Sequence, residues 1–126
     1  MTENSAIKSY RDLNIWKRTK SYAVLIYGVT EKFPSLELYG LTSQMRRAAV
    51  SMPSNIAEGF RRNSKKEKLQ FLRTAFSSGA ELETQLEIAY ELKYLNSETY
   101  GRLAADLDGI MRMINKAISA LGAQVL

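Results

Sequence analysis

The 126-residue sequence contains neither cysteine nor histidine. Without these side chains the chain has no thiolate nucleophile, no imidazole base, no disulfide and no cysteine or histidine ligand for zinc. Serines are present, but none has a histidine to activate it, and no two glycines have the spacing of a phosphate-binding loop. We therefore expect the protein not to be an enzyme and to carry neither a cofactor nor a metal ion.

Long apolar segments are also lacking. The longest uninterrupted apolar run, residues 23–29, is far shorter than the ~18 residues that are needed to cross a bilayer. The N-terminal segment MTENSAIKSY is polar and lacks the apolar stretch of a secretory signal. The sequence therefore predicts a soluble, cytoplasmic protein with no membrane partner.

Proline and glycine are scarce, with two and seven residues, so we expect a few long elements joined by short connections. Apolar residues recur at spacings of three and four, which is typical of α-helices, and no segment reads as a strand. The predicted helices cover residues 12–33, 41–60, 64–94 and 96–121. This pattern predicts an all-α protein, an antiparallel up-down four-helix bundle, with a flexible N-terminal tail over residues 1–11 and a single domain over residues 12–126.

Local signals mark several helix ends. Asp12 is a candidate N-cap for the first helix, and Pro34 is expected to stop that helix. Ser64 followed by Glu67 predicts a capping box at the start of the third helix. Pro53 falls inside the second helix and removes one backbone hydrogen bond, so we expect a kink or a short break there.

The first and third predicted helices have more apolar side chains than one buried stripe requires. A helix that is apolar on more than one side is usually buried on more than one side. In so small a bundle the second side needs another subunit, so this pattern predicts a homo-oligomer. The additional apolar side chains are Trp16, Ala23, Val24, Leu25, Tyr27, Phe71, Ile88 and Tyr90.

Basic residues are concentrated in the first two thirds of the chain. Residues 1–80 hold 14 Lys and Arg against 6 Asp and Glu, whereas residues 81–126 hold 4 against 7. Clustered basic side chains are typical of polyanion binding, because each neutralised phosphate releases condensed counterions. The alternative is a solvated face that keeps the protein soluble or pairs with acidic residues. The candidate phosphate contacts are Arg46, Arg47, Arg61, Arg62, Lys65, Lys66 and Lys68, followed by Lys17, Arg18 and Lys20.

Acidic residues form a stripe on the third helix, because Glu83, Glu87 and Glu91 are spaced by four. Like charges at this spacing repel, so we expect an opposing cationic surface, with Arg46 and Arg47 as candidates within the chain or across a subunit boundary. A carboxylate metal site is the rival interpretation. Di-iron bundles, however, need the histidines that this chain lacks.

Small and aromatic residues each have two interpretations. Small residues gather in the second helix around Ala48 and Ser51 and in the third over residues 77–80, which favours close helix packing over a ligand cleft. Trp16 and the seven tyrosines could stack on nucleic-acid bases, but their helical spacing is more typical of core or interface.

A long central segment carries a family resemblance. Residues 39–72, YGLTSQMRRAAVSMPSNIAEGFRRNSKKEKLQFL, are preceded by DLNIWK and followed by ELETQLEIAYELKYL. Together they resemble the four-helix-bundle family named for reading frames in intervening sequences of bacterial 23S rRNA genes, over residues 10–121. The matching positions are Tyr39, Gly40, Leu41, Gln44, Arg46, Arg47, Ala48, Pro53, Asn55, Ile56, Glu58 and Gly59.

The resemblance implies an antiparallel four-helix bundle that assembles as a ring-shaped homopentamer. The same fold class includes the accessory variability protein of diversity-generating retroelements, a basic pentamer that associates with nucleic acid and a reverse transcriptase. The family offers no agreed catalytic residues to carry over. We therefore expect a non-enzymatic homopentamer that binds RNA or other nucleic acid through phosphates, or alternatively a scaffold that docks a partner protein.

Overall fold

The computed structural model describes residues 7–123, which fold into four α-helices and two short 3-10 helices, with no strand among these residues. The α-helices are α1 (Asn14–Thr30), α2 (Leu41–Phe60), α3 (Lys65–Glu91) and α4 (Ser97–Ala123). The 3-10 helices are η2 (Tyr10–Asp12) and η3 (Ser35–Glu37). The prediction of an all-α chain with four helices is confirmed.

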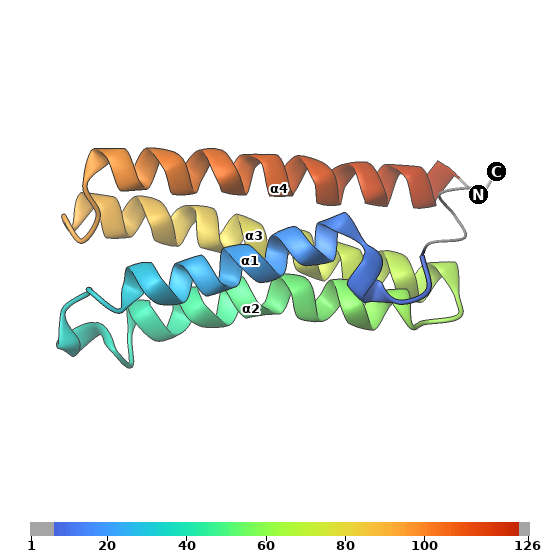
Figure 1. Ribbon diagram of the computed structural model, residues 1–126, viewed down its shortest axis with the longest axis horizontal. Helices are drawn as coiled ribbons and strands as arrows, with labels where there is room; N and C mark the ends of the chain where they lie inside the picture. Colours follow the sequence, from blue (N-terminus) through green and yellow to red (C-terminus); the bar gives the residue numbers. More distant parts are fainter. Residues whose placement is uncertain (1–6, 124–126) are drawn as a thin grey trace.

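The four helices lie side by side along the long axis of the molecule, and the chain reverses direction at each connection (Figure 1). Each helix packs against the next one in the chain, and α1 also meets α4. The contact between α2 and α3 is the most extensive, and that between α1 and α4 is the least extensive of the four. As a result, a recess of about 570 Å³ opens between α1 and α4, lined by residues that include Val24, Leu25 and Arg102.

The core lies between these helices and consists mainly of aliphatic side chains. Leu82, Leu107 and Ile114 are fully buried in it. Tyr22 is also buried, and its hydroxyl donates a hydrogen bond of 2.7 Å to the carbonyl of Leu103. Burial raises the pKa of Tyr22 well above its ordinary value, because the charged form would lose its hydration.

Small residues allow α2 and α3 to approach closely. The hydroxyl groups of Ser51 and Ser78 lie 2.8 Å apart across the helix pair. Gly79 packs against the sulfur-containing side chains of Met52 and Met111 and leaves no room for a side chain of its own. These contacts agree with the interpretation of the small residues as a means of close packing.

The helix caps agree only in part with the sequence signals. At the start of α3, the Ser64 hydroxyl accepts a hydrogen bond of 3.1 Å from the amide of Glu67, as predicted. The Glu67 carboxylate, however, accepts from the Ser64 hydroxyl and not from its backbone amide. At the start of α4, the side chain of Asn96 accepts from the amide of Thr99 at 2.8 Å.

The prediction that Asp12 caps the first helix is wrong. Helix α1 begins at Asn14, and the Asp12 carboxylate instead accepts hydrogen bonds from the amides of Lys8 at 2.8 Å and Ser9 at 3.1 Å. These two bonds lower the pKa of Asp12, because they favour its charged form. The segment assigned to a flexible tail therefore contains, at its end, the ordered turn η2, which packs on α1 and α2.

Helix α2 stays continuous through Pro53, so the short break that the proline allowed does not occur. The proline ring is buried among its neighbours. Two residues later, the side chain of Asn55 donates to the carbonyl of Ser51 at 2.8 Å and to its hydroxyl at 2.9 Å. Helix α2 therefore accommodates a buried proline, although proline disfavours a regular helix.

The first helix also ends earlier than predicted, at Thr30, although Phe33 is still buried in the core. The connection that follows is held by Glu37, whose carboxylate accepts from the hydroxyl of Tyr94, in the α3–α4 connection, at 2.8 Å and from the amide of Leu41, at the start of α2, at 3.1 Å. The bond to Glu37 raises the pKa of Tyr94. Tyr39, two residues after Glu37 in the same connection, is 92% exposed.

Candidate nucleic-acid interface

Five basic residues gather where α2 ends and α3 begins, at the end of the molecule on the right of Figure 1. Arg61 and Lys66 are exposed, and the other three are partly buried. We call this group the basic corner; its members are Arg61, Arg62, Lys65, Lys66 and Lys68. Because the connection between the two helices is short, these residues are close together in space as well as in the sequence.

Two members of the basic corner have partners within the chain. Arg62 forms ion pairs of 3.4 Å with Glu58 and 3.9 Å with Glu67, and its guanidinium carbon lies 4.9 Å from the centre of the Phe71 ring. Lys68 donates to the carbonyl of Phe60 at 3.0 Å, which satisfies a carbonyl at the end of α2. Arg62 and Lys68 therefore stabilise the connection, and these contacts within the chain make their charges less available to a ligand.

The other three members, Arg61, Lys65 and Lys66, form no ion pair among residues 7–123. Lys65 and Lys66 lie in the first turn of α3, where the helix dipole contributes additional positive potential. The positive charges of all three side chains are therefore available to a phosphate group. The dipole at the N-terminus of α3 adds to the positive potential around the two lysines.

Arg46 and Arg47 do not belong to the basic corner. They lie near the start of α2, and 15 residues separate Arg46 from Arg61, or about 22 Å along a helix. Arg46 instead donates to the Thr30 hydroxyl at 2.9 Å and to the Tyr27 carbonyl at 3.3 Å, and so caps the end of α1.

The acidic stripe of Glu83, Glu87 and Glu91 likewise makes no ion pair with Arg46 or Arg47 within residues 7–123. The three side chains are exposed on the outside of α3. The pairing expected within the chain is therefore not found, because Arg46 is held by the end of α1. Pairing across a subunit boundary stays a prediction.

The three basic residues near the start of α1 have different surroundings. Arg18 turns toward α4, where its guanidinium lies 3.2 Å from the sulfur of Met113 and close to Gly109. Lys20 lies over the ring of Trp16, with its ammonium nitrogen 4.9 Å from the ring centre. Lys17 is exposed. Arg18 thus contributes to the contact between α1 and α4, whereas Lys20 lies beside Trp16.

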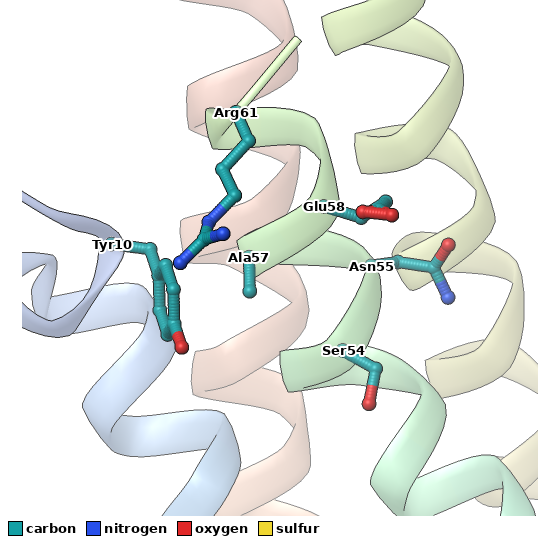
Figure 2. A pocket seen from close by; sticks show the side chains of 6 residues that line it. All are labelled: Tyr10, Ser54, Asn55, Ala57, Glu58 and Arg61. Carbon is teal, nitrogen blue, oxygen red and sulfur yellow. The ribbon is translucent and has the colours of Figure 1, made fainter.

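Tyr10 lies beside the basic corner, and no local signal in the sequence distinguishes it from the other six tyrosines. Its ring lies 5.3 Å from the guanidinium carbon of Arg61, beside an open recess of about 460 Å³. Figure 2 shows the guanidinium of Arg61 beside the Tyr10 ring, with Ala57 to the right of the ring, while Glu58 points toward α3. The recess is lined by Tyr10, Ser54, Asn55, Ala57, Glu58 and Arg61.

One signal in the sequence could have located this turn. Ser9 and Asp12 have the spacing of a capping box, and the Ser9 hydroxyl accepts from the amide of Arg11 at 3.2 Å. This short motif fixes the turn that carries Tyr10. The sequence prediction used Asp12 alone, as the cap of a longer helix.

Metal clusters and membrane spans are two further features that residues 7–123 could contain. No group of three or more Asp and Glu side chains within residues 7–123 is arranged to hold a metal ion. None of the helices described above has the length and apolarity that a membrane crossing requires.

The fold and the sequence define a class: an all-α protein of four long helices, with basic residues concentrated in the first two thirds of the chain. The family model of the 23S rRNA-intervening sequence protein matches residues 11–116. The chain belongs to this family.

A solved structure supports the same fold. It is described as a protein of unknown function from the S23 ribosomal protein family of Bacteroides thetaiotaomicron. The match covers 83% of this chain and 95% of the solved chain, with a TM-score of 0.78 and 21% sequence identity. A comparison with curated protein sequences finds no match. At this level of identity the solved structure bears on the fold alone.

Proposed function

We propose that this protein is a non-enzymatic homo-oligomer, an antiparallel up-down four-helix bundle that assembles as a ring-shaped pentamer and binds nucleic acid. The binding surface in this proposal is the basic corner. The observation that carries it is the position of three basic side chains that form no ion pair among the described residues: Lys65 and Lys66 in the first turn of α3, and Arg61 directly after α2. In a ring, each subunit would repeat this positive surface and strengthen the total field.

Phosphates are the groups that fit this surface best. Lysine and arginine side chains beside a helix N-terminus attract a phosphate by charge and by the backbone dipole. Contacts of this kind bring little sequence specificity, because every nucleotide carries the same phosphate. We therefore expect Arg61, Lys65 and Lys66 to bind the nucleic-acid backbone, with Arg62 and Lys68 holding the connection in shape.

We expect binding of a labelled RNA or DNA to weaken steeply as salt increases, with a slope of about 0.9 per phosphate contact in a double-logarithmic plot for duplex DNA. Replacing Arg61, Lys65 and Lys66 by alanine should remove two to three phosphate contacts. The slope should become smaller by about 0.9 for each of them, because a lost contact no longer releases a counterion. Fluorescence anisotropy of a labelled oligonucleotide across a salt series measures this slope.

A matched control removes the same charge elsewhere. Lys32, Arg102 and Arg112 lie outside the basic corner, on the α1–α2 connection and on α4. Replacing these three by alanine should leave the slope close to that of the unchanged protein. Equal flattening by both triple variants would contradict a localised site, and no binding at low salt would contradict nucleic-acid binding altogether.

The proposal of an oligomer is supported by apolar side chains that the single chain leaves exposed. Val24 is 67% exposed and Leu36 is 79% exposed, and Leu25, Tyr27 and Ile88 are also exposed. Several of them belong to the surplus apolar set of the first and third helices. A second subunit that covers them would remove this surface from water.

We expect the purified protein to sediment at about five times the mass of the 14.3 kDa chain at micromolar concentration, because the exposed apolar surface favours association. Analytical ultracentrifugation measures this mass. As a control, Val24→Glu places a charge on the exposed apolar face of α1 and should shift the mass toward that of one chain. A monomer in the unchanged protein would contradict the assembly.

A protein-interaction scaffold is the second candidate. The exposed side chains Leu36 and Tyr39, on the connection between α1 and α2, favour it, since such groups commonly contact another protein. They lie at the end of the molecule opposite the basic corner (Figure 1). A protein that binds no nucleic acid at low salt and keeps its oligomeric state would support the scaffold.

A further inference from the structure

Aromatic rings and cations alternate at the end of the molecule that carries the basic corner. The ammonium group of Lys20 lies 4.9 Å from the Trp16 ring, and Trp16 meets Tyr10 edge to face at 5.1 Å. The guanidinium carbons of Arg11 and Arg61 lie 4.8 Å and 5.3 Å from the centre of the Tyr10 ring. We call these five residues the aromatic array. Such a combination of cations and rings is typical of surfaces on which nucleic-acid bases stack.

The recess beside Tyr10 offers space for a base. Its volume of about 460 Å³ lies within the range of roughly 300–1,000 Å³ that pockets for small molecules have. Small side chains, Ser54 and Ala57, line it between larger neighbours (Figure 2). The one acidic residue in the lining, Glu58, is paired with Arg62 at 3.4 Å, so its charge is partly compensated.

Arg61 belongs to both surfaces, since it lies against Tyr10 and follows the last residue of α2. A strand of nucleic acid whose phosphates lie on Lys65 and Lys66 would therefore have its bases close to the recess. In a duplex the faces of the bases are covered by their neighbours, whereas an unpaired base can stack on an aromatic ring or on a guanidinium plane. A surface of rings and guanidinium groups therefore suits unpaired nucleotides better than paired ones.

We propose that the recess lined by Tyr10 and Arg61 binds an unpaired base of a single-stranded nucleic acid, stacked on Tyr10 or on the guanidinium of Arg61. This inference rests on the proposed function, because the phosphates of the same strand lie on the basic corner. It adds a preference for single strands, which the charges alone do not provide. The bases of RNA and DNA offer the same face for stacking, so an RNA and a DNA oligonucleotide are tested separately.

The experiment compares labelled oligo(U) and oligo(dT) with a duplex of the same length, using fluorescence anisotropy. Tyr10→Ala should weaken binding of the single strands by at least about fivefold, because one stacked base contributes about 1–3 kcal/mol. It should leave the duplex affinity and the salt slope unchanged. Tyr10→Phe keeps the ring and should bind single strands like the unchanged protein.

Tyr39→Ala is the matched control, because Tyr39 is 92% exposed and lies at the opposite end of α2. It should bind single strands with unchanged affinity. Trp16, the single tryptophan, is in contact with Tyr10 and provides a second readout. Its fluorescence should change when oligo(dT) binds, and this change should be smaller in Tyr10→Ala.

A third variant guards against a purely structural effect of removing Tyr10. Ala57→Leu narrows the recess without removing a ring or a charge, and it should also weaken single-strand binding while duplex binding persists. If Tyr10→Ala and Ala57→Leu both bind single strands like the unchanged protein, the stacking site is wrong, although the basic corner can still bind phosphates. If the unchanged protein binds no oligonucleotide at low salt, both proposals fall.

Discussion

Replacing Leu107 by alanine should lower the free energy of unfolding by about 2–5 kcal/mol. Leu107 lies on α4 and is 0% exposed, in the cluster of aliphatic side chains that all four helices share. Its truncation removes buried apolar surface and leaves a cavity, because packed helices relax only partly around the lost atoms. Urea unfolding followed by circular dichroism, at one fixed protein concentration, measures the change.

The matched control is Leu107→Met, which keeps nearly the same volume and should cost less than about 1.5 kcal/mol. The two variants together separate the loss of packed volume from any change of residue at this position. A Leu107→Ala protein with the stability of the unchanged chain would show that the described core is not the folded core in solution.

Replacing Gly79 by valine is the second substitution with a large expected effect, a loss of about 1–3 kcal/mol of stability. A Cβ atom built on Gly79 would lie in the space of the Met111 sulfur and 3.3 Å from that of Met52. A branched side chain must therefore displace methionines from both neighbouring helices. The same unfolding experiment measures the cost.

Gly101→Val is the control, since a Cβ atom at Gly101 meets nothing within 4 Å. Valine and glycine differ by only a few tenths of a kcal/mol in helix propensity, so the stability of this variant should change by less than about 0.5 kcal/mol. In a Met111→Ala background the cost of Gly79→Val should become smaller, because the side chain in its way has been shortened. An equal cost in both backgrounds would contradict a clash with Met111.

The four helices could be predicted because their evidence is local. Apolar spacings of three and four mark one face of each helix, and Ser64 marks the start of α3 through a bond to the amide of Glu67, three residues along the chain. Helix ends were less accurate where two local signals compete. Asp12 has the chemistry of a cap for a long helix, but in the structure its carboxylate closes a short turn that begins at Ser9.

The candidate site could be predicted only in part, and the reason lies in what each basic side chain contacts. The short connection between α2 and α3 made the basic corner visible in the sequence. No sequence pattern indicated that Arg46 caps the end of α1, or that Arg18 lies against Met113 on α4. These contacts join residues from different helices, 16 and 95 positions apart.

The sequence by itself determined the absence of histidine and cysteine, and with it the loss of most catalytic constellations, as well as the all-α class and the separation of charge along the chain. Only the tertiary structure decided which charges remain available and that Tyr10 joins Arg61 beside a recess. The physical reason is the range of the interactions. Helix formation depends on neighbours three and four residues away, whereas a binding surface depends on side chains that packing brings together from distant parts of the chain.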